Sequence, residues 1–344
     1  MTSRLHLAAL AVVAALAAVT GSFASARVFS RADAAHEMPA SREGRLQTYW
    51  PGGVLKSDIV YRNDVYDGEY RTFYASGAPY ERRHYRSGHE DGRQQSWTED
   101  GTRYLNYEVR DGRRYGLVNA SPCNVVGETS AAVASGSAQA HPARTVATAA
   151  DQPADRTPDG LPYYDEPDFT PRWSPVAHRV ASFELTTQEG RRLSGASLGG
   201  RPYVASFVYT SCAAVCPMLV RQLARVQTAL GDAARIVSFS VTPDTDTPEV
   251  LAAFGRERGI DPRTWSLVTG SKRTIYTLAR TSYFADDSRV GLEPDDARAF
   301  LHSEKLLLVD ADGHLRGVYN GTQPHAVDQL IDDLGRLAFH TSGR

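Results

Sequence analysis

One stretch of the chain decides its fold: Phe207-Val-Tyr-Thr-Ser-Cys-Ala-Ala-Val-Cys-Pro217. Its first residues complete an apolar, β-branched and aromatic run, residues 203–209, which is typical of a buried strand. Thr210-Ser211 then suits the cap of a helix, and apolar side chains recur beyond it at helical spacing. They are Val215, Leu219, Leu223, Val226 and Leu230. The stretch therefore predicts a strand leading into a helix, with Cys212 at the mouth of the helix and Cys216 in its first turn.

The placement of the two cysteines favours thiol or metal chemistry. Unpaired N–H groups and the positive end of the dipole at a helix N-terminus stabilise a thiolate, which is the form that attacks disulfides and binds metals. A four-residue offset brings Cys212 and Cys216 to one face, within reach of each other or of one metal ion. The alternative is two buried cysteines that only pack in a core.

Length and composition limit the classes of protein to consider. The chain has 344 residues, enough for about two domains, and its net charge of −2 gives no electrostatic footprint for nucleic acid. Three cysteines do not make a disulfide scaffold. They allow one pair and leave Cys123 over, without an assigned role.

The N-terminus has the layout of a secretory signal peptide. Arg4 precedes an apolar run from Leu5 to Val19, and the small residues Ala24-Ser-Ala26 follow. We expect residues 1–26 to be removed and the mature protein to be exported to the periplasm, where a dithiol tends to oxidise. An uncleaved membrane anchor is the alternative, although the apolar run is short for a spanning helix.

An internal repeat of 24 residues follows. Its glycines are Gly44, Gly68, Gly92 and Gly116, and its aromatic residues Tyr49, Phe73 and Trp97 keep the same step. The period predicts an all-β domain of tandem hairpins over residues 44–122. The pattern resembles MORN-type repeats, and this resemblance implies a structural or interaction surface for a protein or envelope partner. Tyrosines such as Tyr66 and Tyr85 fit the core of such repeats better than a binding groove.

Residues 123–160 are rich in Ala, Ser, Thr, Pro and Gly, which predicts a flexible linker and two halves that fold independently. A second domain, residues 161–340, then alternates strands and helices. The expected order is a hairpin turning at 188–190, the strand 203–209, the cysteine helix, a strand at 236–241, a helix from 248 to about 258, a strand at 265–268, a helix from 271 to about 283, strands at 305–309 and 315–319, and a helix at 324–337. With two cysteines at the first strand-to-helix corner, this order predicts an α/β, thioredoxin-like fold.

Several motifs of residues 161–340 resemble the Sco/SenC family of thioredoxin-fold copper proteins, which support assembly of the copper site of cytochrome c oxidase. They are Thr210-Ser-Cys-Ala-Ala-Val-Cys-Pro217, Ser240-Val-Thr-Pro-Asp-Thr-Asp-Thr-Pro248, Leu267-Val-Thr-Gly270 and His302-Ser303 before Leu307-Leu-Val-Asp310. The resemblance implies that Cys212, Cys216 and His302 bind copper and that the loop from Thr242 to Pro248 lies beside them. This chain departs from the family pattern at Ala213-Ala214, between the cysteines, and at Thr242.

The chemistry of these residues agrees with copper. Two thiolates suit Cu(I), and an imidazole adds stability for Cu(II). Zinc is a weaker candidate because closed structural zinc sites take four ligands. Asp246 could serve as a general base, but an Asp-Thr-Pro sequence that opens a helix is better interpreted as a cap.

We therefore predict an exported copper chaperone that delivers copper to the copper-site subunit of cytochrome c oxidase, reduces the cysteines of that site, or does both. The main alternative is a thiol–disulfide oxidoreductase without a metal role, in which Cys212 attacks and Cys216 resolves. A third hypothesis is an interaction scaffold that acts through the repeats. The copper donor is not identified by the sequence.

Overall fold

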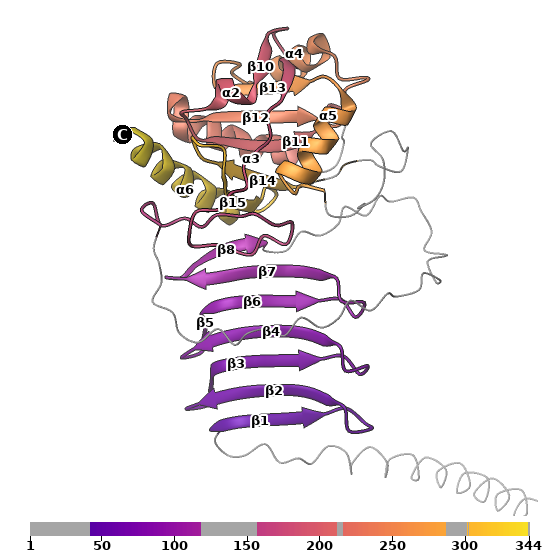
Figure 1. Ribbon diagram of the computed structural model, residues 1–344, viewed down its shortest axis with the longest axis vertical. Helices are drawn as coiled ribbons and strands as arrows, with labels where there is room; N and C mark the ends of the chain where they lie inside the picture. Colours follow the sequence, from indigo (N-terminus) through magenta and orange to yellow (C-terminus); the bar gives the residue numbers. More distant parts are fainter. Residues whose placement is uncertain (1–41, 118–156, 212–215, 287–300, 302, 343–344) are drawn as a thin grey trace, which may run out of the picture.

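The computed structural model describes residues 42–117, 157–211, 216–286, 301 and 303–342 (Figure 1). The expected signal peptide, Cys123, most of the expected linker, Cys212 and His302 lie outside these ranges. The expectations about them are therefore not tested by the structure.

The N-terminal part is one antiparallel sheet of eight strands, which form a single stack in chain order (Figure 1). The strands are β1 (Gly44–Tyr49), β2 (Leu55–Arg62), β3 (Val65–Phe73), β4 (Pro79–Arg86), β5 (His89–Glu90), β6 (Gly92–Trp97), β7 (Arg103–Arg110) and β8 (Arg113–Leu117). The short β5 pairs with β4, beside the main path of the sheet. The tandem hairpins that the 24-residue period predicts are present in this sheet.

The period of the sequence is set by three tight turns. Each turn has two central residues with positive φ, the geometry of a type I′ hairpin, whose twist matches that of the flanking strands. The pairs are Asn63-Asp64 (φ 50° and 65°), Ser87-Gly88 (49° and 81°) and Asp111-Gly112 (51° and 75°). Asn, Asp and Gly tolerate this conformation better than other residues, so their recurrence fixes the register of successive hairpins.

The C-terminal part is a seven-stranded mixed sheet with the order β10-β9-β13-β12-β11-β14-β15. Its strands are β9 (Glu184–Thr187), β10 (Arg192–Ser194), β11 (Tyr203–Val208), β12 (Arg235–Ser240), β13 (Trp265–Thr269), β14 (Lys305–Val309) and β15 (Leu315–Asn320). β11, β12 and β13 are parallel, whereas β14 runs antiparallel to β11 and β15 antiparallel to β14. A parallel strand–helix–strand unit followed by an antiparallel hairpin and a last helix is the thioredoxin-like arrangement that the sequence predicts.

Helices cover both faces of this sheet. They are α2 (Gly195–Leu198), α3 (Cys216–Leu230), α4 (Pro248–Glu257), α5 (Lys272–Thr277) and α6 (Pro324–Ser342), with a 3-10 turn at Gly231–Ala233. The apolar sides of α3, α4 and α6 share one core cluster, and the α5 side holds the other. All six side chains of β11 are buried because both faces of the strand are covered.

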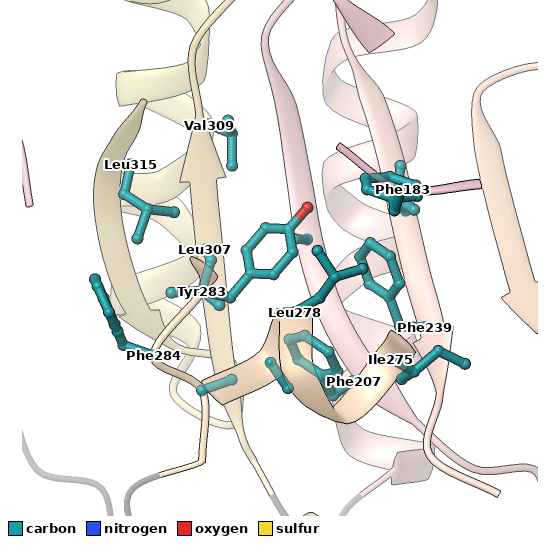
Figure 2. Close-up of a cluster of buried hydrophobic side chains, with 14 of the residues drawn as sticks. Phe183, Phe207, Phe239, Ile275, Leu278, Tyr283, Phe284, Leu307, Val309 and Leu315 are labelled. Atoms are coloured by element: carbon teal, nitrogen blue, oxygen red, sulfur yellow. The ribbon is translucent and has the colours of Figure 1, made fainter. Parts of the chain in front are cut away.

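The core on the α5 side is aromatic (Figure 2). Phe207 and Phe239 stack with ring centroids 5.3 Å apart, and the ring of Tyr283 lies 5.4 Å from that of Phe239. The helix expected to run from 271 to about 283 is an α-helix only as far as Thr277, and it continues as a π-helical turn over Leu278–Ser282. This wider turn ends at Tyr283, which is fully buried and shares a 2.8 Å hydrogen bond with the hydroxyl of Tyr203.

The two sheets meet through β7 and β8. Asn106 on β7 donates to the carbonyl of Asp168 (2.7 Å) and to the hydroxyl of Thr170 (2.8 Å), and Arg103 pairs with the carboxylate of Asp168. The strand β8 lies next to β15 at the top of the stack in Figure 1.

An aromatic contact reinforces this junction. Trp173 packs under the guanidinium of Arg110 (3.6 Å from the ring centroid) and against the edge of Tyr115 (5.2 Å between centroids). The side chains of Tyr115 and Leu117 belong to the two core clusters of the C-terminal part. The composition of residues 123–160 does not indicate this interface, because the residues that make its contacts lie before and after that range in the sequence.

Candidate functional site

The corner between β11 and α3 carries the cysteines. β11 ends at Val208, and the described part of the following helix begins at Cys216, whose side chain is buried at 8 % exposure. Thr210 and Ser211 precede the position of Cys212, which lies outside the described residues. The predicted strand and helix are thus found on either side of the cysteine stretch.

The strand β14 brings a second segment to the same edge of the sheet. Because β14 is antiparallel to β11, with Ala205 opposite Leu307, the C-terminal end of β11 and the N-terminal end of β14 lie at one edge. Lys305 begins β14, and Ser303 precedes it. Ser211 and Ser303, which flank the positions of Cys212 and His302, therefore belong to segments that meet this same edge.

The structure does not test whether the predicted copper ligands, or the two cysteines of the predicted redox pair, lie close together. Cys216 is described, whereas Cys212 and His302 are not. Within the described ranges, no group of three or more His, Cys, Asp and Glu side chains is arranged to hold a metal ion. The ligand set that the sequence predicts stays a prediction.

A buried carboxylate, Asp246, occupies the edge beside this corner. Its side chain is 1 % exposed. One oxygen, Oδ1, accepts from the hydroxyl of Thr210 at 2.6 Å, and the other, Oδ2, accepts from the amide of Thr210 at 3.3 Å. Oδ2 also accepts from the hydroxyls of Ser240 (2.6 Å) and Thr242 (3.0 Å). The carboxylate thus joins the end of β11 to the end of β12.

The interpretation of the Asp-Thr-Pro sequence as a helix cap is confirmed, but the capping residue within it is Thr247, whose hydroxyl accepts from the amide of Val250, and not Asp246. The sequence also suggests Thr210-Ser211 as the cap of the cysteine helix. The hydroxyl of Thr210 donates to Asp246, and residues 212–215 lie outside the described ranges, so this cap stays a prediction. The bond between Thr210 and Asp246 joins positions 36 residues apart and leaves no local pattern in the sequence.

Buried charged groups also lie beside the start of β14, and no sequence pattern indicated them. Lys305 is 3 % exposed, and its ammonium donates to the carbonyl of Phe284 (3.4 Å) and lies 5.3 Å from the ring centroid of Phe169. Nearby, Arg280 pairs with the buried carboxylate of Asp286 at 3.1 Å. These contacts fix the start of β14 against the segment that follows the π-helical turn.

Two histidines away from this corner pack against aromatic rings. The ring of His178 stacks on Phe284 with centroids 4.7 Å apart, and its Nε2 lies 3.0 Å from the carbonyl oxygen of Ser282. His314 is 7 % exposed and meets the ring of Tyr163 edge-on at 5.4 Å. Across the residues that the structure describes, no helix is both long and apolar enough to span a membrane.

Comparison with known proteins identifies the C-terminal part. The family model SCO1/SenC matches residues 173–338. The C-terminal half of this chain is a SCO1/SenC domain. The SCO1 protein homolog of Bacillus subtilis (strain 168) is 29 % identical to it over 164 residues, which are 46 % of this chain and 83 % of that protein. The hairpin sheet, residues 44–117, precedes the matched region.

Solved structures also match this half of the chain. One is BsSco, a member of the Sco family of cytochrome c oxidase assembly proteins in which a disulfide switch was identified. It is 28 % identical, covers 48 % of this chain and 96 % of its own, and has a TM-score of 0.42. Another is ScoI of Bradyrhizobium japonicum with copper bound, which is 27 % identical, covers 47 % of this chain and 99 % of its own, and has a TM-score of 0.37.

Proposed function

We propose that this protein binds one copper ion through Cys212, Cys216 and His302 of its SCO1/SenC domain. The observation that carries the proposal is the shared edge of β11 and β14. The segments that flank all three positions meet at this edge, which follows from the antiparallel pairing of the two strands. A triad assembled from one strand-to-helix corner and one neighbouring loop needs no rearrangement of the sheet.

The donor set suits both oxidation states of copper. Two thiolates satisfy Cu(I), which prefers soft ligands, and an imidazole stabilises Cu(II). Cys216 lies at the start of α3, where the positive end of the helix dipole favours its thiolate form. The copper is cargo in this proposal, so the site must release it as well as bind it.

The proposed task is copper delivery to the copper-site subunit of cytochrome c oxidase, or reduction of the cysteines of that site, during assembly of the oxidase. The SCO1/SenC domain supports this role, since BsSco belongs to a family of oxidase assembly proteins. We further propose that residues 1–26 direct export to the periplasm, that residues 123–160 are a linker, and that the hairpins are MORN-type repeats that bind a protein or envelope partner.

A thiol–disulfide oxidoreductase without a metal role is the second candidate. The observation that favours it is the position of Cys216 at a helix N-terminus, which supports a reactive thiolate whether or not metal is bound. In that case Cys212 would attack the disulfide of a substrate and Cys216 would release the product by forming an intramolecular disulfide. His302 would then have no part in the reaction.

Copper stoichiometry of the reduced, mature protein tests the first proposal against the second. We expect one copper per chain for the wild type and for Cys123→Ser, which serves as the matched control. Cys212→Ser and Cys216→Ser should each abolish stable binding. Undiminished copper in the Cys212→Ser protein would rule out this ligand assignment.

A further inference from the structure

The carboxylate of Asp246 accepts hydrogen bonds from several residues, one of which is distant in the sequence. It is 1 % exposed and accepts four hydrogen bonds, from the hydroxyls of Thr210, Ser240 and Thr242 and from the amide of Thr210. No Lys or Arg side chain of the described ranges forms an ion pair with it. Burial of an ionised carboxylate raises the free energy of the folded state unless its oxygens accept hydrogen bonds. The four donors therefore stabilise the carboxylate of Asp246 in its buried position.

The partners of Asp246 belong to two separate segments. Ser240 ends β12, and its hydroxyl also accepts from the amide of Thr242, so these two residues form one rigid support. Thr210 belongs to the other segment, the corner that follows β11. Both its amide and its hydroxyl donate to Asp246, which fixes the backbone and the side chain of Thr210 together.

We infer that Asp246 is a positioning residue for the cysteine corner: by holding Thr210, two residues before Cys212, it sets how readily Cys212 and Cys216 form a disulfide. The inference rests on the proposed pairing of these two cysteines. The ease of forming a disulfide depends on the effective concentration of one thiol at the other, and this falls when one side of the corner is released. Asp246 reaches the cysteines through Thr210 and is not itself a ligand.

The test is the reduction potential of the dithiol in the full-length protein, measured without metal. Asp246→Asn keeps the shape of the side chain and removes its charge, which weakens the bonds from Thr210. We expect the equilibrium constant for disulfide formation to fall about tenfold, a shift of about 30 mV toward a less negative potential. The readout is the fraction of alkylated thiol after equilibration in dithiothreitol of varied redox ratio.

Two matched substitutions separate positioning from general stability. Thr210→Val removes the 2.6 Å bond on the cysteine side, whereas Thr242→Val removes a bond to the same carboxylate on the β12 side. We expect Thr210→Val to shift the potential in the direction of Asp246→Asn and Thr242→Val to leave it near the wild-type value. Asp333→Asn alters a buried carboxylate on α6 and should leave the potential unchanged, whatever its effect on melting temperature.

The outcomes are distinct for the inference and for the proposed function. A wild-type potential in both Asp246→Asn and Thr210→Val would overturn the inference, and so would equal shifts in Thr210→Val and Thr242→Val. Because Thr210→Val and Thr242→Val leave the carboxylate in place, they decide the question even if Asp246→Asn fails to fold. Failure of the wild type to bind copper would overturn the proposed function. It would not affect the test of the inference, because the reduction potentials are measured without metal.

Discussion

Arg113 on β8 donates to the carboxylate of Asp333 on α6 at 2.6 Å, across 220 positions of the sequence. Asp333 is fully buried and also accepts from the hydroxyl of Tyr319 at 2.9 Å. Burial raises the pKa of the Asp333 carboxyl, and the nearby Arg113 guanidinium opposes that shift. Gln329, one turn earlier on α6, donates to the carbonyl of Arg114 at 2.8 Å. The last hairpin of the N-terminal sheet is therefore joined to the SCO1/SenC domain by polar contacts at and near the buried carboxylate of Asp333.

Loss of the cation should destabilise this junction. Arg113→Ala leaves the Asp333 carboxylate buried without its charged partner, and we expect the free energy of unfolding to fall by about 3 kcal/mol. Arg113→Lys keeps the charge and should recover part of the loss. Urea unfolding at neutral pH measures both variants against the wild type. Equal stability of Arg113→Ala and the wild type would mean that the pair contributes nothing.

A fragment that lacks the hairpin sheet should be less stable than the full chain, contrary to the independence expected from the linker composition. Phe169 and Tyr164 are at most 1 % exposed, and both share a core cluster with Leu117 of β8. We expect a fragment beginning at residue 157 to melt at a lower temperature and to bind more of an apolar dye. A fragment beginning at Gly92 keeps β6 to β8 and is the matched control. Identical melting of the two fragments would show that the interface does not stabilise the domain.

The sequence predicted what depends on local repetition. The 24-residue period predicted the hairpins because each turn needs residues that accept positive φ, and the β11–α3 corner followed from a change of apolar period at Thr210-Ser211. Contacts between distant positions could not be predicted in this way. Thr210 with Asp246 and Arg113 with Asp333 each join ordinary-looking polar residues whose partners are fixed only by the folded sheets.

Acid should weaken the N-terminal sheet through Asp58. Hydrogen bonding from Arg45 is the main cause that lowers the pKa of the Asp58 carboxyl from 3.8 to about 2, and Arg71 adds to it. A carboxyl with a lowered pKa stabilises the fold above its unfolded pKa, so this contribution is complete above pH 4 and is lost as the pH falls to 2. It amounts to about 2 kcal/mol.

The matched variant for this prediction is Asp58→Asn, which cannot ionise. We expect the difference in unfolding free energy between the wild type and Asp58→Asn to be largest near neutral pH and to shrink between pH 4 and pH 2. Urea titrations at several pH values measure this difference. A difference that stays constant over this range would show that the ion pairs of Asp58 with Arg45 and Arg71 do not stabilise the fold.

The role of His302 separates copper delivery from thiol exchange. Exchange needs only an attacking and a resolving sulfur, whereas Cu(II) at a two-sulfur site also needs a nitrogen ligand. His302→Ala should therefore lose Cu(II) and its thiolate-to-copper absorption band, while the two cysteines retain Cu(I) with weaker affinity. His178→Ala, which removes a histidine packed on Phe284 outside the proposed site, is the spectroscopic control and should keep the band.

In cells that depend on this protein, His302→Ala should reduce oxidase activity, with partial recovery in excess copper, and Cys212→Ser should serve as the null. Full oxidase activity with His302→Ala would contradict copper delivery and favour thiol exchange. Thiol exchange does not use the imidazole of His302, so its removal would leave the activity of an oxidoreductase unchanged.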